Sequence, residues 1–251
     1  MILEKIRKYY PQAVSSADFV RRIYDVLCRD YRIAPRDILL AHSVCSDDVI
    51  NIEYPTEGRE MLGPFNLGGL DGYPFAGATG MGAFSKHVPD TGAALVFYGP
   101  HIGIGANPDD AQSATVGKIL RVGQTTPSAC CGAAQAALDK LENDTIFRGD
   151  APKDPLDYQQ QTLEEIIWRE RERISSAENR LIAATNAVYE ASGRTIDRLI
   201  ERTAFTGEYV FVVGAVIINS DWQDGAFLEL RRFDCLDAAT KQIKAQHLAT
   251  S

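Results

Sequence analysis

The stretch that decides the fold is Ile38-Leu39-Leu40-Ala41-His42-Ser43-Val44-Cys45-Ser46-Asp47-Asp48, an apolar run that ends in a thiol and two carboxylates. A short apolar run bounded by polar residues predicts a buried strand of a largely parallel sheet. Open α/β sheets bind their ligands just outside the carboxyl ends of such strands. Cys45 and Asp47 are two residues apart, so on an extended chain they point to the same side. The strand tip therefore offers half of a metal site, or half of a nucleophile-and-partner pair.

Other apolar runs predict the rest of the sheet. Residues Ala93–Tyr98 and 208–218 are almost uninterrupted apolar runs, which is typical of buried strands. Residues 227–233 alternate between apolar and polar side chains, and Gly225 lies in the turn before them, which indicates a hairpin with 208–218. Helices are predicted at 1–32, from the cysteine pair to about 141, at 157–204 and at 238–248. Strands separated by helices indicate the α/β fold class.

Composition and charge exclude several classes of protein. The 251 residues suffice for one large α/β domain or two small ones. The formal net charge of −8 argues against nucleic acid as the main partner, because phosphate binding needs a basic face. Residues 1–11 lack the apolar core that a secretory signal requires, and no run approaches the about 20 apolar residues of a membrane span. Five cysteines without a disulfide pattern complete the prediction of a cytoplasmic, or at least intracellular, protein with no membrane partner.

Three separate segments offer ligands that zinc prefers. They are Cys45 after the first strand, His101 after the second, and Cys130 or Cys131 at the start of a predicted helix. Two thiolates and one imidazole with a free fourth position are typical of catalytic zinc. The alternative is that these residues are unrelated, because a cysteine is often a buried core residue and a histidine can be a hydrogen-bonded one. The residues alone leave both interpretations open.

Eight different short motifs are spread over most of the chain, and many of them lie in the stretch 51–90. That stretch is dense in glycine, but its aromatic residues are too many for a linker. The motifs are Cys45-Ser-Asp47-Asp48, Leu62-Gly-Pro-Phe65, Gly68-Gly-Leu70, Gly72-Tyr-Pro74, Gly82-Ala-Phe84, His87-Val-Pro-Asp90, Tyr98-Gly-Pro-His101-Ile-Gly103 and Ala129-Cys-Cys131-Gly-Ala133. In combination they resemble the limiting-CO2-inducible protein B/C family, the theta-class carbonic anhydrases, which are related in site design to the beta class.

The resemblance implies a fold and an assembly. The fold is a beta-carbonic-anhydrase-like sheet with a mostly parallel core and antiparallel C-terminal strands, flanked by helices. Residues 1–251 would form a single zinc-binding domain, with the N-terminal helices (about 1–32) and the long helices (about 157–204) packing outside the sheet. The resemblance also implies a homodimer.

The resemblance further implies a zinc site and a reaction. Zinc would be held by Cys45, His101 and Cys131, with Cys131 preferred to Cys130 because it precedes Gly132, as in the Cys-Gly of the beta class. A metal-bound hydroxide would then attack CO2, giving the reversible, zinc-dependent hydration of CO2 to bicarbonate. Both substrates are small molecules.

Asp47 and an arginine have implied roles beside the zinc. Asp47 would orient the hydroxide, and an arginine would keep this carboxylate off the metal by bidentate pairing. The beta-class pattern Cys-x-Asp-x-Arg has its arginine where this chain has Val49, so Arg59 is the nearest candidate. His87 would shuttle protons. The predicted wall of a dry CO2 pocket consists of Phe65, Tyr73, Phe75 and Phe84.

Two other functions stay open. The chain can be a cysteine-nucleophile hydrolase or transferase, with Cys45 or Cys131 as nucleophile and His101 as base. It can also be a zinc-binding family member without turnover, with a regulatory or binding role in inorganic-carbon handling, if Asp47 closes onto the metal. Whether an arginine reaches Asp47 in the fold is the feature that favours one outcome over the other.

Overall fold

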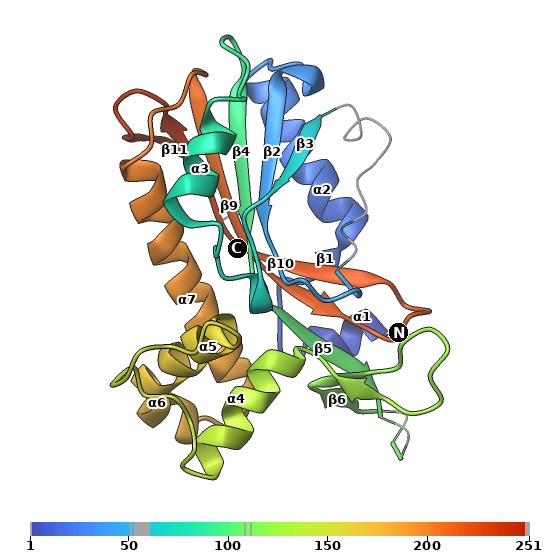
Figure 1. Ribbon diagram of the computed structural model, residues 1–251. Helices are drawn as coiled ribbons and strands as arrows, with labels where there is room; N and C mark the ends of the chain where they lie inside the picture. The colour runs from blue at the N-terminus through green and yellow to red at the C-terminus, as the bar shows by residue number, and fades with distance from the viewer. Residues whose placement is uncertain (1, 51, 53–60, 108, 111, 249–251) are drawn as a thin grey trace.

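The computed structural model describes residues 2–50, 52, 61–107, 109–110 and 112–248, and in this part of the chain a nine-stranded sheet is flanked by helices (Figure 1). The strands are β1 (Val14–Ser15), β2 (Ile38–Ser43), β3 (Leu62–Asn66), β4 (Ala93–Tyr98), β5 (His101–Ala106), β6 (Ala114–Val116), β7 (Lys118–Ile119), β8 (Ser128–Ala129), β9 (Tyr209–Asn219), β10 (Ala226–Asp237) and β11 (Ile243–Gln246). The helices are α1 (Ile2–Ile6), α2 (Ser16–Asp25), α3 (Gly77–Ser85), α4 (Gly132–Glu142), α5 (Tyr158–Arg169), α6 (Arg171–Ser175) and α7 (Arg180–Glu201), with short helical turns η1 (Val26–Asp30), η2 (Pro35–Asp37) and η4 (Leu70–Gly72).

The sheet has the predicted mixed topology. Its main order is β1-β10-β9-β4-β2-β3. Strands β3, β2, β4 and β9 are parallel, and β5 is a further parallel neighbour of β9. Strand β10 returns antiparallel to β9, which confirms the predicted hairpin, and β1 and β11 pair antiparallel with β10. The parallel core with antiparallel C-terminal strands is therefore confirmed.

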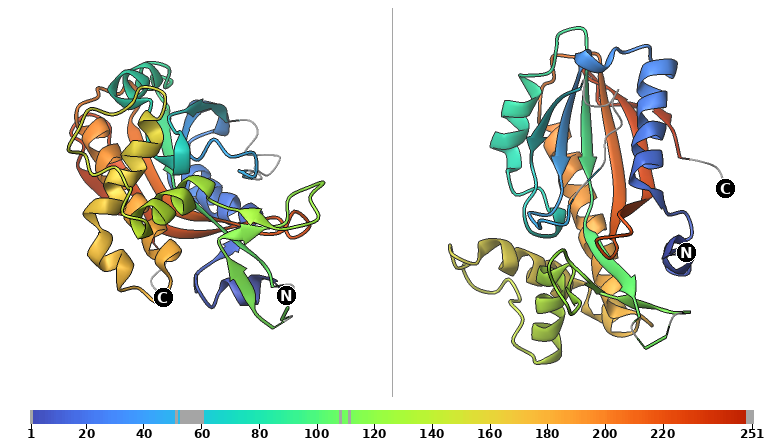
Figure 2. Two further views of the ribbon diagram at one scale, coloured as in Figure 1. Left: turned by 60° about the horizontal axis from the view of Figure 1, so that its bottom comes forward. Right: turned by 90° about the vertical axis from the view of Figure 1, so that its right-hand side faces the viewer.

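Helices cover both faces of the sheet because its central strands are apolar on both faces. All six residues of β4 are buried, as are ten of the eleven residues of β9. Phe19 and Ile23 of α2 pack in the cluster on one face, whereas Phe84 of α3 and Ile196 of α7 pack on the other. The right-hand view of Figure 2 shows α2 on one side of the sheet, and α3 and α7 on the other.

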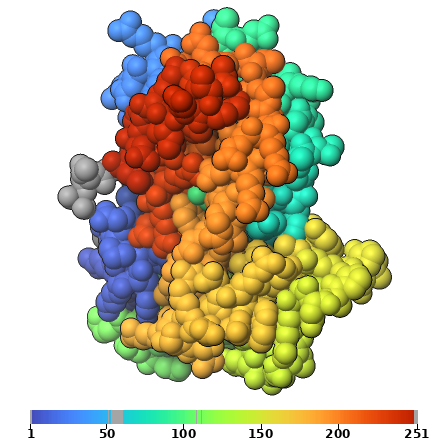
Figure 3. All heavy atoms as spheres, turned by 90° about the vertical axis from the view of Figure 1, so that its left-hand side faces the viewer, coloured from blue at the N-terminus to red at the C-terminus, as the bar shows by residue number. Residues whose placement is uncertain are grey.

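Helices α4, α5 and α6 and the start of α7 gather beyond the carboxyl ends of the parallel strands (Figure 1). Leu138, Ile167, Ile174 and Leu181, from α4, α5, α6 and α7, pack in one cluster. The predicted helical segment 157–204 thus consists of three helices, and Figure 3 shows α7 running along one face beside the last strands. Among the described helices, none combines the length and the apolar character that crossing a membrane requires.

Two predicted helical segments differ from the structure. Residues 1–32 are interrupted between α1 and α2, where β1 pairs with β10. The helix predicted at 238–248 is wrong. Asp237 Oδ1 accepts hydrogen bonds from the amides of Ala239 and Thr240, which closes a tight turn, and the chain then adds β11 to the free edge of β10. The unpaired backbone groups at the edge of β10 thus favour a strand in this segment, although its sequence pattern is typical of a helix.

The link between β4 and β5 generates a prediction about stability. A Cβ atom added at Gly99 would lie 2.0 Å from the Ala215 carbonyl oxygen of β9, whereas one added at Gly82 of α3 meets nothing within 4 Å. We expect Gly99→Ala to lower the free energy of unfolding by about 1–3 kcal/mol, because backbone must shift. Gly82→Ala should raise it by about 0.5–1 kcal/mol. Denaturant unfolding measures both, and an unchanged midpoint for Gly99→Ala would contradict the close approach.

Candidate metal centre

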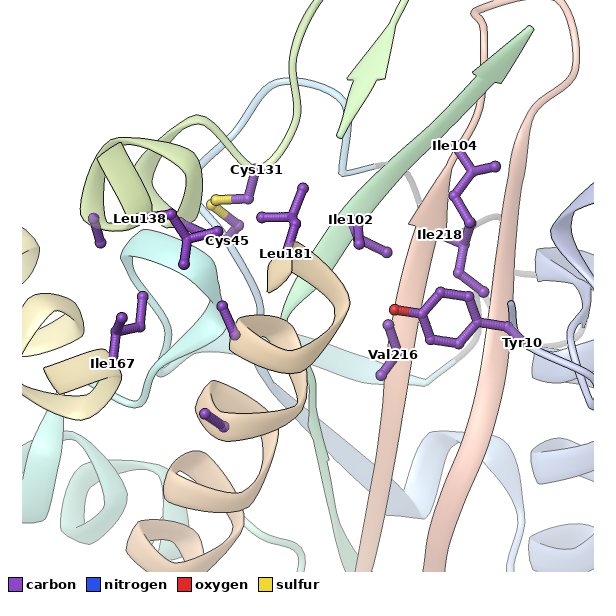
Figure 4. Packing of buried hydrophobic residues seen from close by; sticks show 14 of the residues in the cluster. Tyr10, Cys45, Ile102, Ile104, Cys131, Leu138, Ile167, Leu181, Val216 and Ile218 are labelled. Carbon is purple, nitrogen blue, oxygen red and sulfur yellow. The ribbon is translucent and has the colours of Figure 1, made fainter. Parts of the chain in front are cut away.

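Three elements deliver sulfur and nitrogen atoms to one buried point. Cys45 follows the last residue of β2 by two positions, His101 opens β5, and Cys131 is the N-cap of α4. Their relative exposures are 7%, 0% and 2%. One ligand atom from each lies within 4.8 Å of the other two, and Figure 4 shows the two sulfur atoms side by side between Leu138 and Leu181. The structure thus brings together the three residues that the family resemblance indicated.

The two ring nitrogens of His101 have different surroundings, because Nδ1 is hydrogen-bonded and Nε2, in the described part of the chain, is not. Its Nδ1 lies 2.9 Å from Asn219 Oδ1 and 3.5 Å from Cys130 Sγ. Its Nε2 is buried, and no described residue forms a hydrogen bond with it. Buried polar atoms are rarely left unpaired, so an orphaned imidazole nitrogen beside two thiols fits a bound metal ion. Thiolate and imidazole donors suit transition metals, zinc among them.

A second combination of Asp47, His101 and Cys130 lies equally close together but fits one ion less well. Cys130 Sγ approaches Nδ1 of the ring, whereas Asp47 Oδ2 lies 4.0 Å from Nε2. A single ion binds one nitrogen of an imidazole, because the two lone pairs diverge. The geometry therefore favours Cys131 over Cys130 as the thiol that shares an ion with Cys45.

Cys45 and Cys131 hold one proton between them. The hydrogen bond from the Cys131 thiol lowers the pKa of Cys45 to about 4, against the effect of burial, and His101 acts in the same direction. The same hydrogen bond, together with burial, raises the pKa of Cys131 well above its ordinary value. Since only a thiolate binds metal, Cys45 is already in its ligand form.

Asp47 is held by Arg121 rather than by the expected arginine. Arg121 Nη1 and Nη2 donate to the two carboxylate oxygens of Asp47 at 2.8 and 3.0 Å. Burial by itself would raise the pKa of Asp47, but the hydrogen bonds from Arg121 hold this pKa well below its usual range. Arg121 also donates to Asp48 and to the Ser128 hydroxyl. Arg59 lies outside the described residues.

Sequence reasoning missed Arg121, and also Asp71. Asp71 is fully buried in η4, where its amide donates to Cys45 Sγ at 3.2 Å and its Oδ1 accepts from the His101 amide at 3.1 Å. Burial raises the pKa of Asp71 to about 7. Asp71 thus ties two of the candidate ligands together. The available signal was a lone carboxylate between the glycines of Gly68-Gly-Leu-Asp-Gly72.

The aromatic residues predicted to wall a CO2 pocket fall into two groups. Phe65 packs against Phe84 and against the exposed His87, with ring centroids 5.9 and 6.2 Å apart, on the α3 side of the sheet. Tyr73 and Phe75 pack against each other, and the Tyr73 hydroxyl forms a hydrogen bond with the hydroxyl of Thr195 of α7. Within the described residues, no hydrogen bond or ring contact joins any of the five to the three candidate ligands. Their roles stay predictions.

A cavity of about 290 Å³ borders the centre at Arg121 and Asn219. Its other walls include apolar side chains, among them Ile119, Val122 and Trp222. Small apolar molecules can therefore approach the two residues that hold Asp47 and His101.

Comparison with known proteins identifies the family. A family model described as limiting CO2-inducible proteins B/C beta carbonic anhydrases matches residues 13–237. The crystal structure of PtLCIB4, a homolog of the limiting CO2-inducible protein LCIB, is 28% identical with a TM-score of 0.84, covering 98% of this chain and 100% of that one. A single-residue variant of PtLCIB4 is 27% identical with a TM-score of 0.84, covering 99% of each chain.

The crystal structure of LCIB is 19% identical with a TM-score of 0.69, covering 95% of this chain and 96% of that one, which supports the fold alone. No curated protein matched the chain at significant similarity. Because the family model spans most of the described sequence, the chain belongs to the family of limiting CO2-inducible proteins B/C, the beta carbonic anhydrases of that name.

Proposed function

We propose that the protein is a zinc-dependent carbonic anhydrase, which catalyses the reversible hydration of CO2 to bicarbonate. The observation that carries the proposal is the buried, unpaired Nε2 of His101 beside the thiols of Cys45 and Cys131. Family membership supports the same activity. Zinc at these three donors would act as a Lewis acid and make water a nucleophile at neutral pH.

Asp47 is the residue that we propose orients the attacking water. Its Oδ2 lies 4.0 Å from His101 Nε2, so the carboxylate stands at the edge of the ligand set. Arg121 pairs with both oxygens, which keeps the carboxylate charged and fixes its direction. The remaining lone pairs of Asp47 can accept a hydrogen bond from water without releasing the arginine. CO2 would enter through the cavity lined by Val122 and Trp222.

The two alternative functions receive less support. A silent site needs Asp47 to close onto the metal, but the bidentate pair with Arg121 opposes that movement. A cysteine nucleophile needs a low thiol pKa, which Cys45 has, but also access to substrate. Cys45 is 7% exposed and is hydrogen-bonded to the Asp71 amide, so its sulfur is poorly placed to attack.

We also propose, from the family resemblance, that residues 1–251 act as one domain and that two chains form a homodimer, and, from the cysteine usage, that the protein is cytoplasmic. Coverage of 98% of this chain and 100% of PtLCIB4 supports a common domain extent. Light scattering on the purified protein should give a mass twice the 27.6 kDa of one chain. A mass of one chain at micromolar concentration would contradict the dimer.

Removing single thiols tests the ligand set. We expect wild type to bind one zinc per chain, and Cys45→Ser and Cys131→Ser each to lose stoichiometric zinc and CO2 hydration, because two protein donors bind zinc far more weakly than three. Cys28→Ser, at a partly exposed helical position, should keep both. Elemental analysis and stopped-flow hydration measure the outcome. Zinc-free wild type that is inactivated by thiol alkylation would instead favour the hydrolase.

Replacing Arg121 tests the role of the carboxylate pair. Lysine cannot form the bidentate contact, so Arg121→Lys should lower kcat/KM for CO2 by about 10- to 100-fold while zinc content stays unchanged. Arg29→Lys alters an exposed pair with Asp25 and should leave kcat/KM as in wild type. Full activity of Arg121→Lys would show that Asp47 needs no bidentate partner.

A further inference from the structure

We infer that Asn219, the last residue of β9, is a positioning residue that selects the tautomer of His101 and thereby sets the metal affinity of the centre. The inference rests on the metal ion of the proposed function but not on the reaction. Asn219 is 3% exposed, so its side-chain amide must find partners inside the protein.

The hydrogen bonds of Asn219 determine which way its amide points. Its Nδ2 donates to the carbonyl oxygen of Val49 at 2.8 Å. A backbone carbonyl can only accept, so the amide nitrogen faces Val49 and Oδ1 faces the imidazole at 2.9 Å. Since Oδ1 can also only accept, Nδ1 of His101 must carry the proton. The neutral ring then has a bare lone pair on Nε2, the nitrogen that faces the thiols.

Cys130 completes this arrangement from the side of Nδ1. Its Sγ lies 3.5 Å from Nδ1 and donates to Asn219 Oδ1 at 3.8 Å. Oδ1 of Asn219 therefore accepts from both the ring and the thiol. This contact gives Cys130 a role in supporting His101, and it explains why two adjacent cysteines face one histidine from different sides.

The strand register keeps Asn219 at this position. Strands β5 and β9 pair in parallel, with His101 opposite Ile217 and Gly103 opposite Asn219. The side chains of positions 217 and 219 therefore lie on one face of β9. A Cβ atom at Gly103 would lie 2.9 Å from Cys130 Cβ, so the missing side chain leaves room for the thiol beside Asn219. The acceptor is thus supplied by a strand of which ten of the eleven residues are buried.

Loss of the Asn219 Oδ1 acceptor should allow the His101 tautomer that is protonated on Nε2 and cannot bind the metal. Without Oδ1, the Nδ1 proton has no oxygen acceptor in its buried surroundings, and the proton can move to Nε2, where it blocks the metal. Outer-shell partners of metal-binding histidines typically contribute about 10- to 100-fold in metal affinity. A residue that only filled space would affect stability but not the tautomer.

The test compares two substitutions at one position. Asn219→Leu keeps the side-chain size and removes the acceptor, and we expect its zinc Kd to rise by about 10- to 100-fold, measured by chelator competition. Asn219→Asp keeps an oxygen acceptor for Nδ1, and its zinc Kd should stay within about threefold of wild type. Asn186→Leu, on α7, removes an amide oxygen that accepts a hydrogen bond from Arg231 of β10, and it should leave the zinc Kd unchanged.

A second readout separates orientation from simple packing. Burial lowers the pKa of His101, but the neighbouring thiols of Cys130 and Cys45 raise it well above its ordinary value, so the tautomer is read at a pH at which the ring is neutral. There, long-range ¹H–¹⁵N NMR on the metal-free protein should show His101, one of four histidines, protonated on Nδ1 in wild type and substantially on Nε2 in Asn219→Leu. Zinc affinity equal to wild type in Asn219→Leu, or an unchanged tautomer, would overturn the inference. If Asn219→Leu does not fold, Asn219→Asp decides: a Kd raised about 10-fold or more would overturn it. Zinc binding without CO2 hydration in wild type would refute the proposed function alone.

Discussion

The parallel pairing of β2 with β4, and of β4 with β9, is the constraint on which the candidate centre depends. Pairs from Ile38 with Ala93 to Ser43 with Tyr98 align the carboxyl ends of β2 and β4. Tyr98 in turn pairs with Gly214, so β9 runs on past both ends and offers a continuing edge to β5. His101 therefore begins a new strand directly beyond the tip that carries Cys45. One sheet register brings the two ligands together.

Charge is the second constraint, because the site collects acidic groups where water is scarce. Cys45 has a pKa low enough to be a thiolate, and Asp47 is held as a carboxylate by Arg121. Asp71 adds a third acidic group that is fully buried, and its Oδ2 has no hydrogen-bond partner among the residues that the structure describes. Buried charges are costly unless they are paired, and within the described part of the chain Arg121 pairs with Asp47 but with neither Cys45 nor Asp71. A divalent cation at the thiols would complement this charge distribution.

Local sequence patterns predict those features of the structure that depend on neighbouring residues, and they do not predict contacts between residues far apart in the chain. The strands that precede Cys45 and His101, the helix after Cys131 and the C-terminal hairpin follow from local apolar runs and turns, and the structure has them, whereas the strand that His101 itself begins was not predicted. Arg121 reaches Asp47 across 74 residues and Asn219 reaches His101 across 118, and neither position carries a local pattern. The 238–248 segment shows the converse, since an open strand edge overrode a helical pattern. Register, which pairs distant residues, is what local patterns lack.

At position 49 the chain departs from the beta-class pattern, and backbone hydrogen bonds take over the task of linking the two sides of the site. Valine stands where that pattern has its arginine, and the backbone of Val49 links the two sides of the site instead. Its amide donates to Asp47 Oδ1 at 3.2 Å, and its carbonyl accepts from Asn219 at 2.8 Å. The loop that carries Asp47 is thereby tied to the strand that orients His101. A shift of this loop would disturb the carboxylate and the imidazole together, so the arginine can come from elsewhere in the chain as long as Val49 keeps both contacts.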